Sequence, residues 1–289
     1  MGATDYRIGL GGGIAVAVLS LMVLGATPPW PAVALAKVAA PRTFPKHVLA
    51  WADVRNGYQH DSITHAVSTI ERLGWESGLY DTIIRTDSQS ITKSPILFKQ
   101  GTGIATGEQF LARNLNYFDA IFFFGVREID LDAQQREDLL RFVRDDGKGF
   151  VSTHSAATAF FSWPEYGEMV GARFDEHPWG ISEATVIVED RSSPITKHLP
   201  ASFSVVDEHY QLKDFNRQNV HVLARLDATK LDLKAPLVHR TDRDFVAAYT
   251  KTYGKGRVFY STLGHPRELW DEKWLQTIYF EALKWVMNQ

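Results

Sequence analysis

The segment GKGFVSTHSAA, residues 147–157, decides the fold of this chain. It predicts a short apolar strand over 149–153 that breaks at His154 and Ser155 and leads into an alanine-rich helix start. In open α/β sheets, ligands and catalytic groups lie at the carboxyl ends of strands, next to helix starts. A sharp turn there presents one side chain, as a nucleophile elbow does. Here that side chain is His154 rather than serine or cysteine, so the geometry of a nucleophile site is kept while its chemistry changes.

The segments before this one extend it into a sheet. Apolar runs predict strands, and helical periodicity predicts helices between them. In chain order the expected elements are a strand over 47–54, a helix over 63–73, strands over 80–87 and 117–126, and a helix over 133–145 capped by Asp132. A turn-rich, irregular stretch is expected over 88–107. Alternating strands and helices at this spacing predict a doubly wound, mainly parallel α/β sheet.

The second half of the chain has a different pattern. It predicts strands over 184–188 and 220–226, a hairpin of 245–252 with 257–262, and a closing helix over 270–287. On that helix Trp274, Ile278, Ala282 and Trp285 are expected to share one face. The economical interpretation is one domain whose irregular, β-rich second half lies over the carboxyl edge of the sheet.

Composition excludes several classes of protein. The chain has 289 residues, of which 45% are hydrophobic and 22% charged, as in ordinary globular proteins. A net charge of −3 without basic blocks argues against nucleic acid as a partner. The complete absence of cysteine excludes disulfides, thiolate zinc sites and thiol nucleophiles. Without a Walker loop, or G-x-G-x-x-G after a strand, we expect no nucleotide cofactor.

The N-terminus has the pattern of a targeting segment. Arg7 precedes an apolar run over 8–24, and an A-x-A pattern at 34–36 suits cleavage after Ala36. We therefore expect a signal peptide over 1–36, a linker over 37–45, a domain over 46–289, and a periplasmic or extracellular location. The alternative is an uncleaved membrane anchor over 8–25, the one case in which a membrane would be a partner.

Ten histidines occur in the chain, and five of them follow apolar runs or lie in loops near them: His60, His154, His177, His209 and His265. In a doubly wound sheet His60, His154 and His265 would face one crevice. Converging imidazoles and carboxylates can hold a divalent metal, with zinc the first candidate, or transfer protons near neutral pH. The spacing leaves both tasks open, and any single histidine of this kind is more often a hydrogen-bonding loop residue.

We expect a polar centre in which His154, Glu208 and His265 are the catalytic groups. The candidate metal ligands are His154, His177, Glu208 and His265, and His60 is placed at the rim as a substrate-binding residue. The aromatic residues near these loops are Trp163, Tyr166, Trp179 and Tyr210. Such rings more often pack in a core or lid, but their clustering here favours a carbohydrate-sized pocket, because sugar CH faces stack on aromatic rings.

Several short motifs occur in a characteristic order. They are HDS (60–62), GKGFVSTHSAA (147–157), WPEY (163–166), GARF (171–174), HP (177–178), SPIT (193–196) with LP (199–200), DEHY (207–210), YGKGRVFY (253–260) and LGH (263–265). In this order and spacing the chain resembles the trehalose-utilization (ThuA-like) family from about residue 47 to the C-terminus. One departure is local: that family pattern places a tryptophan after a proline before the hairpin, where this chain has Phe245 and Val246.

The resemblance implies a flavodoxin-like fold similar to class I glutamine amidotransferases. Those enzymes carry a cysteine at the elbow that His154 occupies, so glutamine hydrolysis through a thioester is not available here. The resemblance also implies a role in metabolism of disaccharides, including keto sugars. The leading hypothesis is an exported hydrolase, lyase or isomerase acting on a disaccharide or keto-sugar glycoside. The alternatives are a non-catalytic carbohydrate-binding protein and a cell-wall-associated domain with structural histidines.

Overall fold

The computed structural model describes residues 42–55, 57–98 and 110–289, and residues 43–289 form one compact unit. The expected signal peptide and most of the expected linker lie outside the described residues. Part of the turn-rich stretch is described, and it contains β3 (Ile96–Phe98), which pairs with β4 (Phe110–Ala112). Within the described ranges, none of the helices is both long and apolar enough to cross a membrane.

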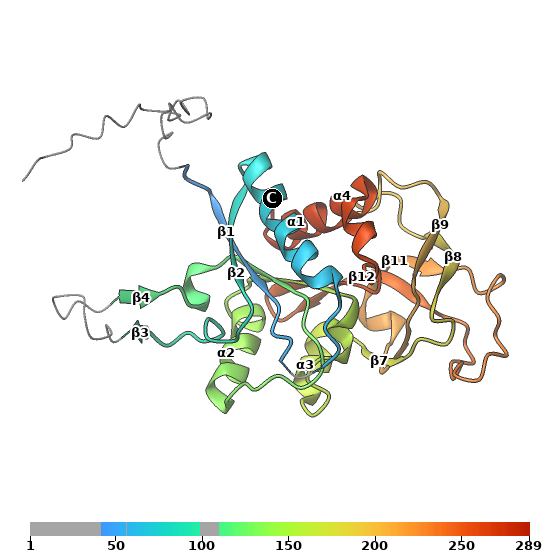
Figure 1. Ribbon diagram of the computed structural model, residues 1–289, viewed down its shortest axis with the longest axis horizontal. Helices are drawn as coiled ribbons and strands as arrows, with labels where there is room; N and C mark the ends of the chain where they lie inside the picture. Colours follow the sequence, from blue (N-terminus) through green and yellow to red (C-terminus); the bar gives the residue numbers. More distant parts are fainter. Residues whose placement is uncertain (1–41, 56, 99–109) are drawn as a thin grey trace, which may run out of the picture. The chain divides into compact units, whose positions relative to one another are not determined.

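One large sheet dominates this unit (Figure 1). Its strands are β1 (Lys46–Trp51), β2 (Tyr80–Arg85), β5 (Ala120–Phe123), β6 (Gly149–Thr153), β8 (Ile181–Val188), β9 (Ser202–Glu208), β11 (His221–Leu226), β12 (Val246–Tyr253) and β13 (Gly256–Ser261). They form nine strands in the order β2-β1-β5-β6-β13-β12-β11-β8-β9. Neighbours from β2 to β13 run parallel, and neighbours from β13 to β9 run antiparallel. The expected α/β fold with a mainly parallel sheet is confirmed.

Helices cover both faces of the parallel part. In Figure 1, α1 (Ser62–Ser77) and α4 (Lys273–Val286) lie on one side of the sheet, and α2 (Ala133–Arg144) and α3 (Pro164–Val170) lie on the other. Two separate apolar clusters correspond to these two faces. Successive side chains of a strand point to opposite faces. Accordingly Val48 and Ala50 of β1 pack with α1, whereas Leu49 and Trp51 pack with α2.

Local sequence explains where two of these helices begin and end. Asp132 accepts a hydrogen bond from the backbone N–H of Gln135, whose side chain reciprocates, so α2 starts with the expected cap. Helix α1 begins at Ser62, with Asp61 at the N-cap making no side-chain cap bond. It continues past the predicted end at residue 73. Gly74 does not end the helix but lies inside it, where the Tyr80 ring leaves no room for a side chain, since a Cβ would lie 2.3 Å from that ring. The left-handed residue that ends α1 is Gly78.

The second half of the chain is more regular than the sequence suggests. Strands β8, β11 and β12 lengthen the main sheet, and only a small antiparallel pair, β7 (Arg173–Glu176) with β10 (Gln211–Lys213), lies outside it. The predicted hairpin is confirmed, with Tyr253 paired to Gly256 across its turn. Strand β13 is also the parallel neighbour of β6. This pairing places the chain segments that follow β6 and β13 side by side.

The closing helix begins later than expected. Residues 267–271 form the 3-10 helix η4 (Arg267–Asp271), and α4 starts at Lys273. Its buried side consists of Leu275, Ile278, Tyr279, Ala282, Leu283 and Val286. Trp274 and Trp285 are partly exposed at the edges of this face, and they pack against the same cluster as Ile278 and Ala282, so the predicted shared face is confirmed. The remaining 3-10 segments are η1 (Leu115–Tyr117), η2 (His154–Thr158) and η3 (Arg217–Asn219).

Candidate metal and catalytic site

His154 occupies a sharp turn directly after β6. Its φ is +43°, in the left-handed region that residues other than glycine rarely adopt and that recurs at functional sites. The expected elbow is therefore present, although the 3-10 helix η2 follows it instead of an α-helix. The ring is fully buried, and its Nδ1 lies 2.8 Å from the carbonyl oxygen of Thr262. Because a carbonyl only accepts, Nδ1 carries the hydrogen and Nε2 is left to face the site.

Two residues from other strands meet His154 Nε2. His265 follows β13, the parallel neighbour of β6, and its Nδ1 lies 3.0 Å from His154 Nε2. Glu208 is the last residue of β9, and its Oε2 lies 3.3 Å from His154 Nε2 and 3.2 Å from His265 Nδ1. The three residues predicted as the polar centre therefore lie within side-chain reach, with their donor atoms at the corners of a nearly equilateral triangle.

His60 completes the group from the loop between β1 and α1. Its ring makes edge contacts with the rings of His154 and His265, at centroid distances of 5.0 and 4.9 Å. One ligand atom from each of His60, His154, Glu208 and His265 lies within 4.8 Å of the others. Expected at the rim, His60 is instead buried, and its Nδ1 has no hydrogen-bond partner among the described residues. An unsatisfied buried ring nitrogen is costly in a purely structural role.

The triangle of donor atoms fits a divalent metal. Zinc binds histidine nitrogen and carboxylate oxygen at about 2.0–2.1 Å. With these bond lengths, donor atoms about 3.2 Å apart subtend an angle of about 100° at the ion, between the octahedral and tetrahedral values. Nitrogen and oxygen donors without sulfur suit zinc and other first-row divalent ions. The residues present therefore fit a metal centre.

Charge interactions within the group are strong. Burial, helped by repulsion from His154 and His265, lowers the pKa of His60 to about 3, so this ring is neutral near pH 7. Burial acts to raise the pKa of Glu208, but hydrogen bonds with the two other histidines outweigh it and hold that pKa below its usual range. Burial acts to lower the pKa of His265, and the Glu208 carboxylate overcomes this and raises it. A carboxylate and a neutral imidazole are the forms that bind metal.

Tyr210 covers one side of the centre. Its ring stacks on His154 at 4.3 Å between centroids, and its hydroxyl lies 2.9 Å from His154 Nε2. Burial first, and then the nearby Glu208, raises the pKa of Tyr210 well above its usual value. The hydroxyl therefore keeps its proton at neutral pH and can donate a hydrogen bond into the site. Of the aromatic residues expected near a substrate, this is the one placed at the centre.

Asp207 holds the backbone segments that carry two of these side chains, a role not expected from the sequence. Its buried carboxylate accepts hydrogen bonds from three backbone N–H groups: Gly264 at 2.8 Å, His265 at 3.0 Å and Glu208 at 2.8 Å. It thereby joins the end of β9 to the loop after β13, the two segments that carry Glu208 and His265. The alternation along β9 contains the signal, because Asp207 follows Phe203 and Val205 on the inward side.

A cavity of about 360 Å³ opens beside the centre. Its lining includes His60, Glu208, Tyr210, His265 and His177. His177, which we expected among the metal ligands, has its Nε2 4.0 Å from Glu208 Oε1 and a side chain that is 45% exposed. It lies outside the group of four, and His60 stands in its place.

The other three aromatic residues do not line this cavity, which corrects the expectation that they contact substrate. Trp163 and Tyr166 are buried in the cluster between the sheet, α2 and α3, and the Tyr166 hydroxyl donates to the carbonyl of Ala156. Trp179 packs edge-on against Phe245 at 4.9 Å and donates to a backbone carbonyl. Their rings are needed for packing, as aromatic residues near buried strands usually are.

A flavodoxin-like sheet with an elbow after a central strand defines a class I glutamine amidotransferase-like fold, here with histidine at the elbow. A family model described as "Trehalose utilisation" (ThuA) matches residues 47–286, and the chain belongs to this family. No functionally curated protein matches the sequence.

Solved structures of related proteins have the same fold. A ThuA-like protein of Bacteroides uniformis is 22% identical and aligns with a TM-score of 0.65 over 87% of this chain and 94% of its own. A ThuA-like protein of Parabacteroides merdae is 16% identical, with a TM-score of 0.59 over 84% and 90%. A cytoplasmic protein of Salmonella typhimurium LT2 is 12% identical, with a TM-score of 0.52 over 83% and 99%. At these identities the likeness concerns the fold.

Proposed function

We propose that this chain is a metal-dependent enzyme of carbohydrate metabolism that acts on a disaccharide or a keto-sugar glycoside. The observation that carries the proposal is the triangle of donor atoms from His154, Glu208 and His265, with sides of 3.0–3.3 Å and His60 beside it. A structural cluster has no need for four ionisable groups to converge at the carboxyl edge of a parallel sheet, which is where active sites of such sheets lie. The family description supports a sugar as substrate.

The side chains have distinct roles in this proposal. His154, Glu208 and His265 would hold the ion, with His60 as a further donor, and the bound metal would activate water or polarise a carbonyl group. The bond from His154 Nδ1 to Thr262 fixes the tautomer in which Nε2 is unprotonated and can ligate. Tyr210 can donate to a substrate oxygen, and His177 lies close enough to Glu208 to move protons between the cavity and solvent. These groups suit a hydrolase, a lyase or an isomerase.

The cellular location belongs to the same proposal. The apolar N-terminal run and A-x-A pattern support export to the periplasm or the outside of the cell. An exported enzyme without cysteine would not depend on the redox state of its compartment. Detection of the mature N-terminus by mass spectrometry, with Lys37 as the expected first residue, tests this part separately.

Metal analysis of the purified protein tests the centre. We expect about one equivalent of divalent metal in the wild type and none in His154→Ala. His221→Ala is the matched control, because His221 is exposed and pairs with Asp190 away from the site. Turnover of oxidised and unoxidised disaccharides should be lost in the first variant and kept in the second. A metal-free protein whose sugar turnover survives His154→Ala would refute the proposal. Tight sugar binding without product would instead indicate a carbohydrate-binding protein.

A further inference from the structure

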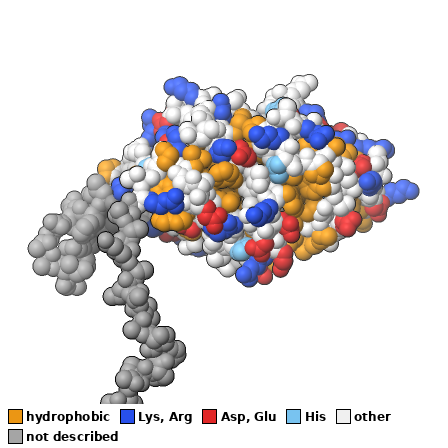
Figure 2. Space-filling view, turned by 90° about the horizontal axis from the view of Figure 1, so that it is seen from above, with side chains coloured by type: hydrophobic (Ala, Val, Ile, Leu, Met, Phe, Trp, Pro, Cys, Tyr) orange, Lys and Arg blue, Asp and Glu red, His pale blue; other side chains and the backbone are white. Residues whose placement is uncertain are grey.

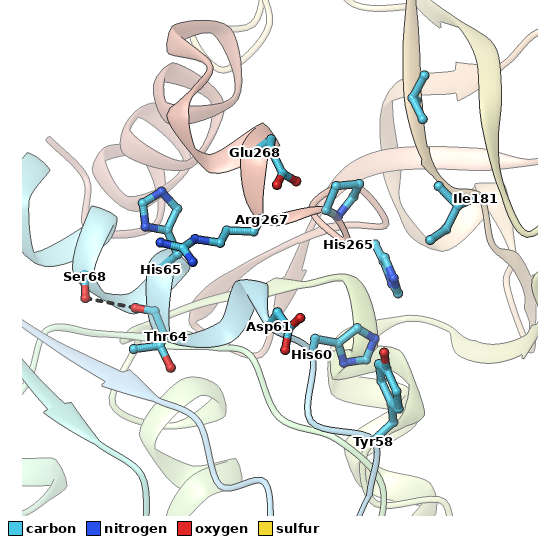
Figure 3. A pocket seen from close by; sticks show the side chains of 12 residues that line it. Tyr58, His60, Asp61, Thr64, His65, Ser68, Ile181, His265, Arg267 and Glu268 are labelled. Carbon is cyan, nitrogen blue, oxygen red and sulfur yellow. Dashed lines mark hydrogen bonds between the residues drawn. The ribbon is translucent and has the colours of Figure 1, made fainter.

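We propose that a second, larger cavity beside the centre is a subsite for the non-reacting ring of a neutral sugar, so that the substrate spans at least two rings. This inference rests on the proposed function. The cavity has a volume of about 800 Å³ and lies between the first turns of α1 and the segment that leads into η4 (Figure 3). Such a volume is within the usual range for small-molecule sites.

The two cavities adjoin at the candidate centre. Both are lined by Tyr58, His60, Ile181 and His265. The His60 and His265 rings touch at 4.9 Å between centroids, and of the two cavities only the smaller is lined by Glu208 and Tyr210. A ligand that fills both cavities would pass His60 and His265 at their junction, which places the bond between two sugar rings next to the reacting groups.

Three charged side chains of the larger cavity are free to receive a ligand. Figure 3 shows Asp61 at the N-cap of α1 and Thr64 in its first turn, opposite Arg267 and Glu268 from η4. Within the described part of the chain, the carboxylates of Asp61 and Glu268 and the guanidinium of Arg267 have no hydrogen-bond or ion-pair partner. Two acidic groups and one basic group give a mixed set of acceptors and donors. Such a set suits hydroxyl groups, which both donate and accept, better than a strongly charged ligand.

An apolar wall accompanies these polar groups. Among the described residues, seven large hydrophobic side chains are exposed, and three of them line this cavity: Tyr58 (67% exposed), Ile181 (59%) and Val206 (50%). A concentration of exposed apolar side chains around one cavity marks a binding site more often than chance exposure. The Tyr58 ring can stack on the CH face of a sugar. Polar groups on one side and an apolar wall on the other match the two kinds of surface that a pyranose presents.

The surface around this region does not favour charged ligands. Figure 2 shows basic and acidic side chains interspersed across the face seen from the side of α1 and α4, without a large field of one sign. Long-range attraction would therefore add little for a charged substrate. Recognition would come from hydrogen bonds and stacking within the cavity.

Binding measurements on the metal-loaded protein test the subsite, with glucose, trehalose and maltose as probes. The measured quantity is the Kd, or the KM for a sugar that is turned over. We expect at least one disaccharide to bind ten-fold or more tightly than glucose. Thr64→Trp should fill the cavity from an exposed helix position, and Tyr58→Ala should remove the platform. Thr64→Trp should weaken the disaccharide about ten-fold and leave glucose affinity, metal content and Tm unchanged. Tyr58 lines both cavities, so Tyr58→Ala should weaken the disaccharide and glucose alike while metal content and Tm stay unchanged. Arg72→Trp, exposed on α1 outside the lining, is the control and should change nothing.

The possible failures are distinguishable. If the protein holds metal but binds disaccharides no more tightly than glucose, or if Thr64→Trp binds them as the wild type does, the subsite is refuted while the metal centre stands. If the wild type holds no metal yet binds disaccharides in a Thr64-dependent manner, the cavity is a sugar site and the proposed enzyme is refuted. If no sugar binds to the metal-loaded protein, both the subsite and the sugar substrate are refuted.

Discussion

Replacing Asp207 should weaken both the fold and the proposed metal centre. In Asp207→Ala, three backbone N–H groups lose their acceptor, one of them buried and two partly buried, at a cost of up to about 1–3 kcal/mol each before relaxation. Burial raises the pKa of Asp207, which means that holding this carboxylate ionised destabilises the folded state. Removing the charge therefore offsets part of the stability lost with the hydrogen bonds. We therefore expect a net destabilisation of about 3 kcal/mol. For a domain of this size that lowers the Tm by roughly 6–12 °C.

The same substitution should lower the affinity for metal. His265 and Glu208 both have their backbone N–H groups bound to Asp207, so its removal frees two ligand-bearing segments. Loss of a residue that orients ligands typically costs 10–100-fold in metal affinity. Asp207→Asn should be intermediate, because an amide oxygen at the Oδ1 position keeps the bonds from His265 and Glu208 and loses only the bond from Gly264. The assays are differential scanning calorimetry and titration with Zn²⁺.

A matched variant separates positioning from stability. Asp190 also accepts backbone N–H bonds, from Ser192 and Ser193, and lies at a distance from the centre in the turn after β8. Asp190→Ala should lower the Tm without changing the affinity for Zn²⁺. If Asp207→Ala lowers the Tm but binds Zn²⁺ as tightly as the wild type, the positioning argument fails. An unchanged Tm would contradict the hydrogen-bond estimate itself.

Three further predictions concern other parts of the molecule. Burial acts to raise the pKa of Asp53, but hydrogen bonds from an arginine and a serine outweigh it and lower that pKa. The resulting stabilisation is fully present above the unfolded pKa of about 4 and is lost as pH falls through the lower folded pKa, so Asp53→Asn should lower the Tm at pH 7 by more than it does in acid. Gly254→Ala should lower the free energy of unfolding, measured in urea, by about 2–4 kcal/mol, because its φ is +58° and a Cβ would lie 2.2 Å from a carbonyl oxygen. Gly180 has a φ of +55° but open space around it, so Gly180→Ala should lower this free energy by about 1 kcal/mol. Tyr166→Phe should lower the free energy of unfolding by about 1 kcal/mol, because the hydrogen bond to Ala156 is lost, and should leave sugar affinity unchanged. Weaker sugar binding by this variant would indicate that Tyr166 contacts the sugar after all.

Periodicity and turn chemistry predict much of the fold. The strand at 149–153 and the hairpin of β12 and β13 follow from local patterns of two to ten residues, so the sequence is sufficient to place them. Asp132 was identifiable as a cap because its partner is three residues away. The same local reasoning ended α1 too early, because Gly74 has a packing partner in the next strand that no local pattern reveals.

The site depends on contacts between distant segments, and there the sequence is less informative. Strand ends place His154 and His265 together, as expected, since both strands belong to the parallel set. The choice between His60 and His177 depends on how deeply each loop enters the centre, which spacing does not encode. Trp163 and Tyr166 adjoin a histidine loop in sequence, but their rings fill the layer between α2, α3 and the sheet.

The order of the donor residues along the chain has a consequence for folding. His60 comes before α1 and His265 comes after the last strand, so a chain that ends before residue 265 lacks a complete set of donors. Metal uptake would then report assembly of the complete main sheet, and a protein refolded in excess metal would gain stability against global unfolding. At a free metal concentration 100 times the Kd this gain is about 2.7 kcal/mol, enough for the ion to act as a final check on a finished fold.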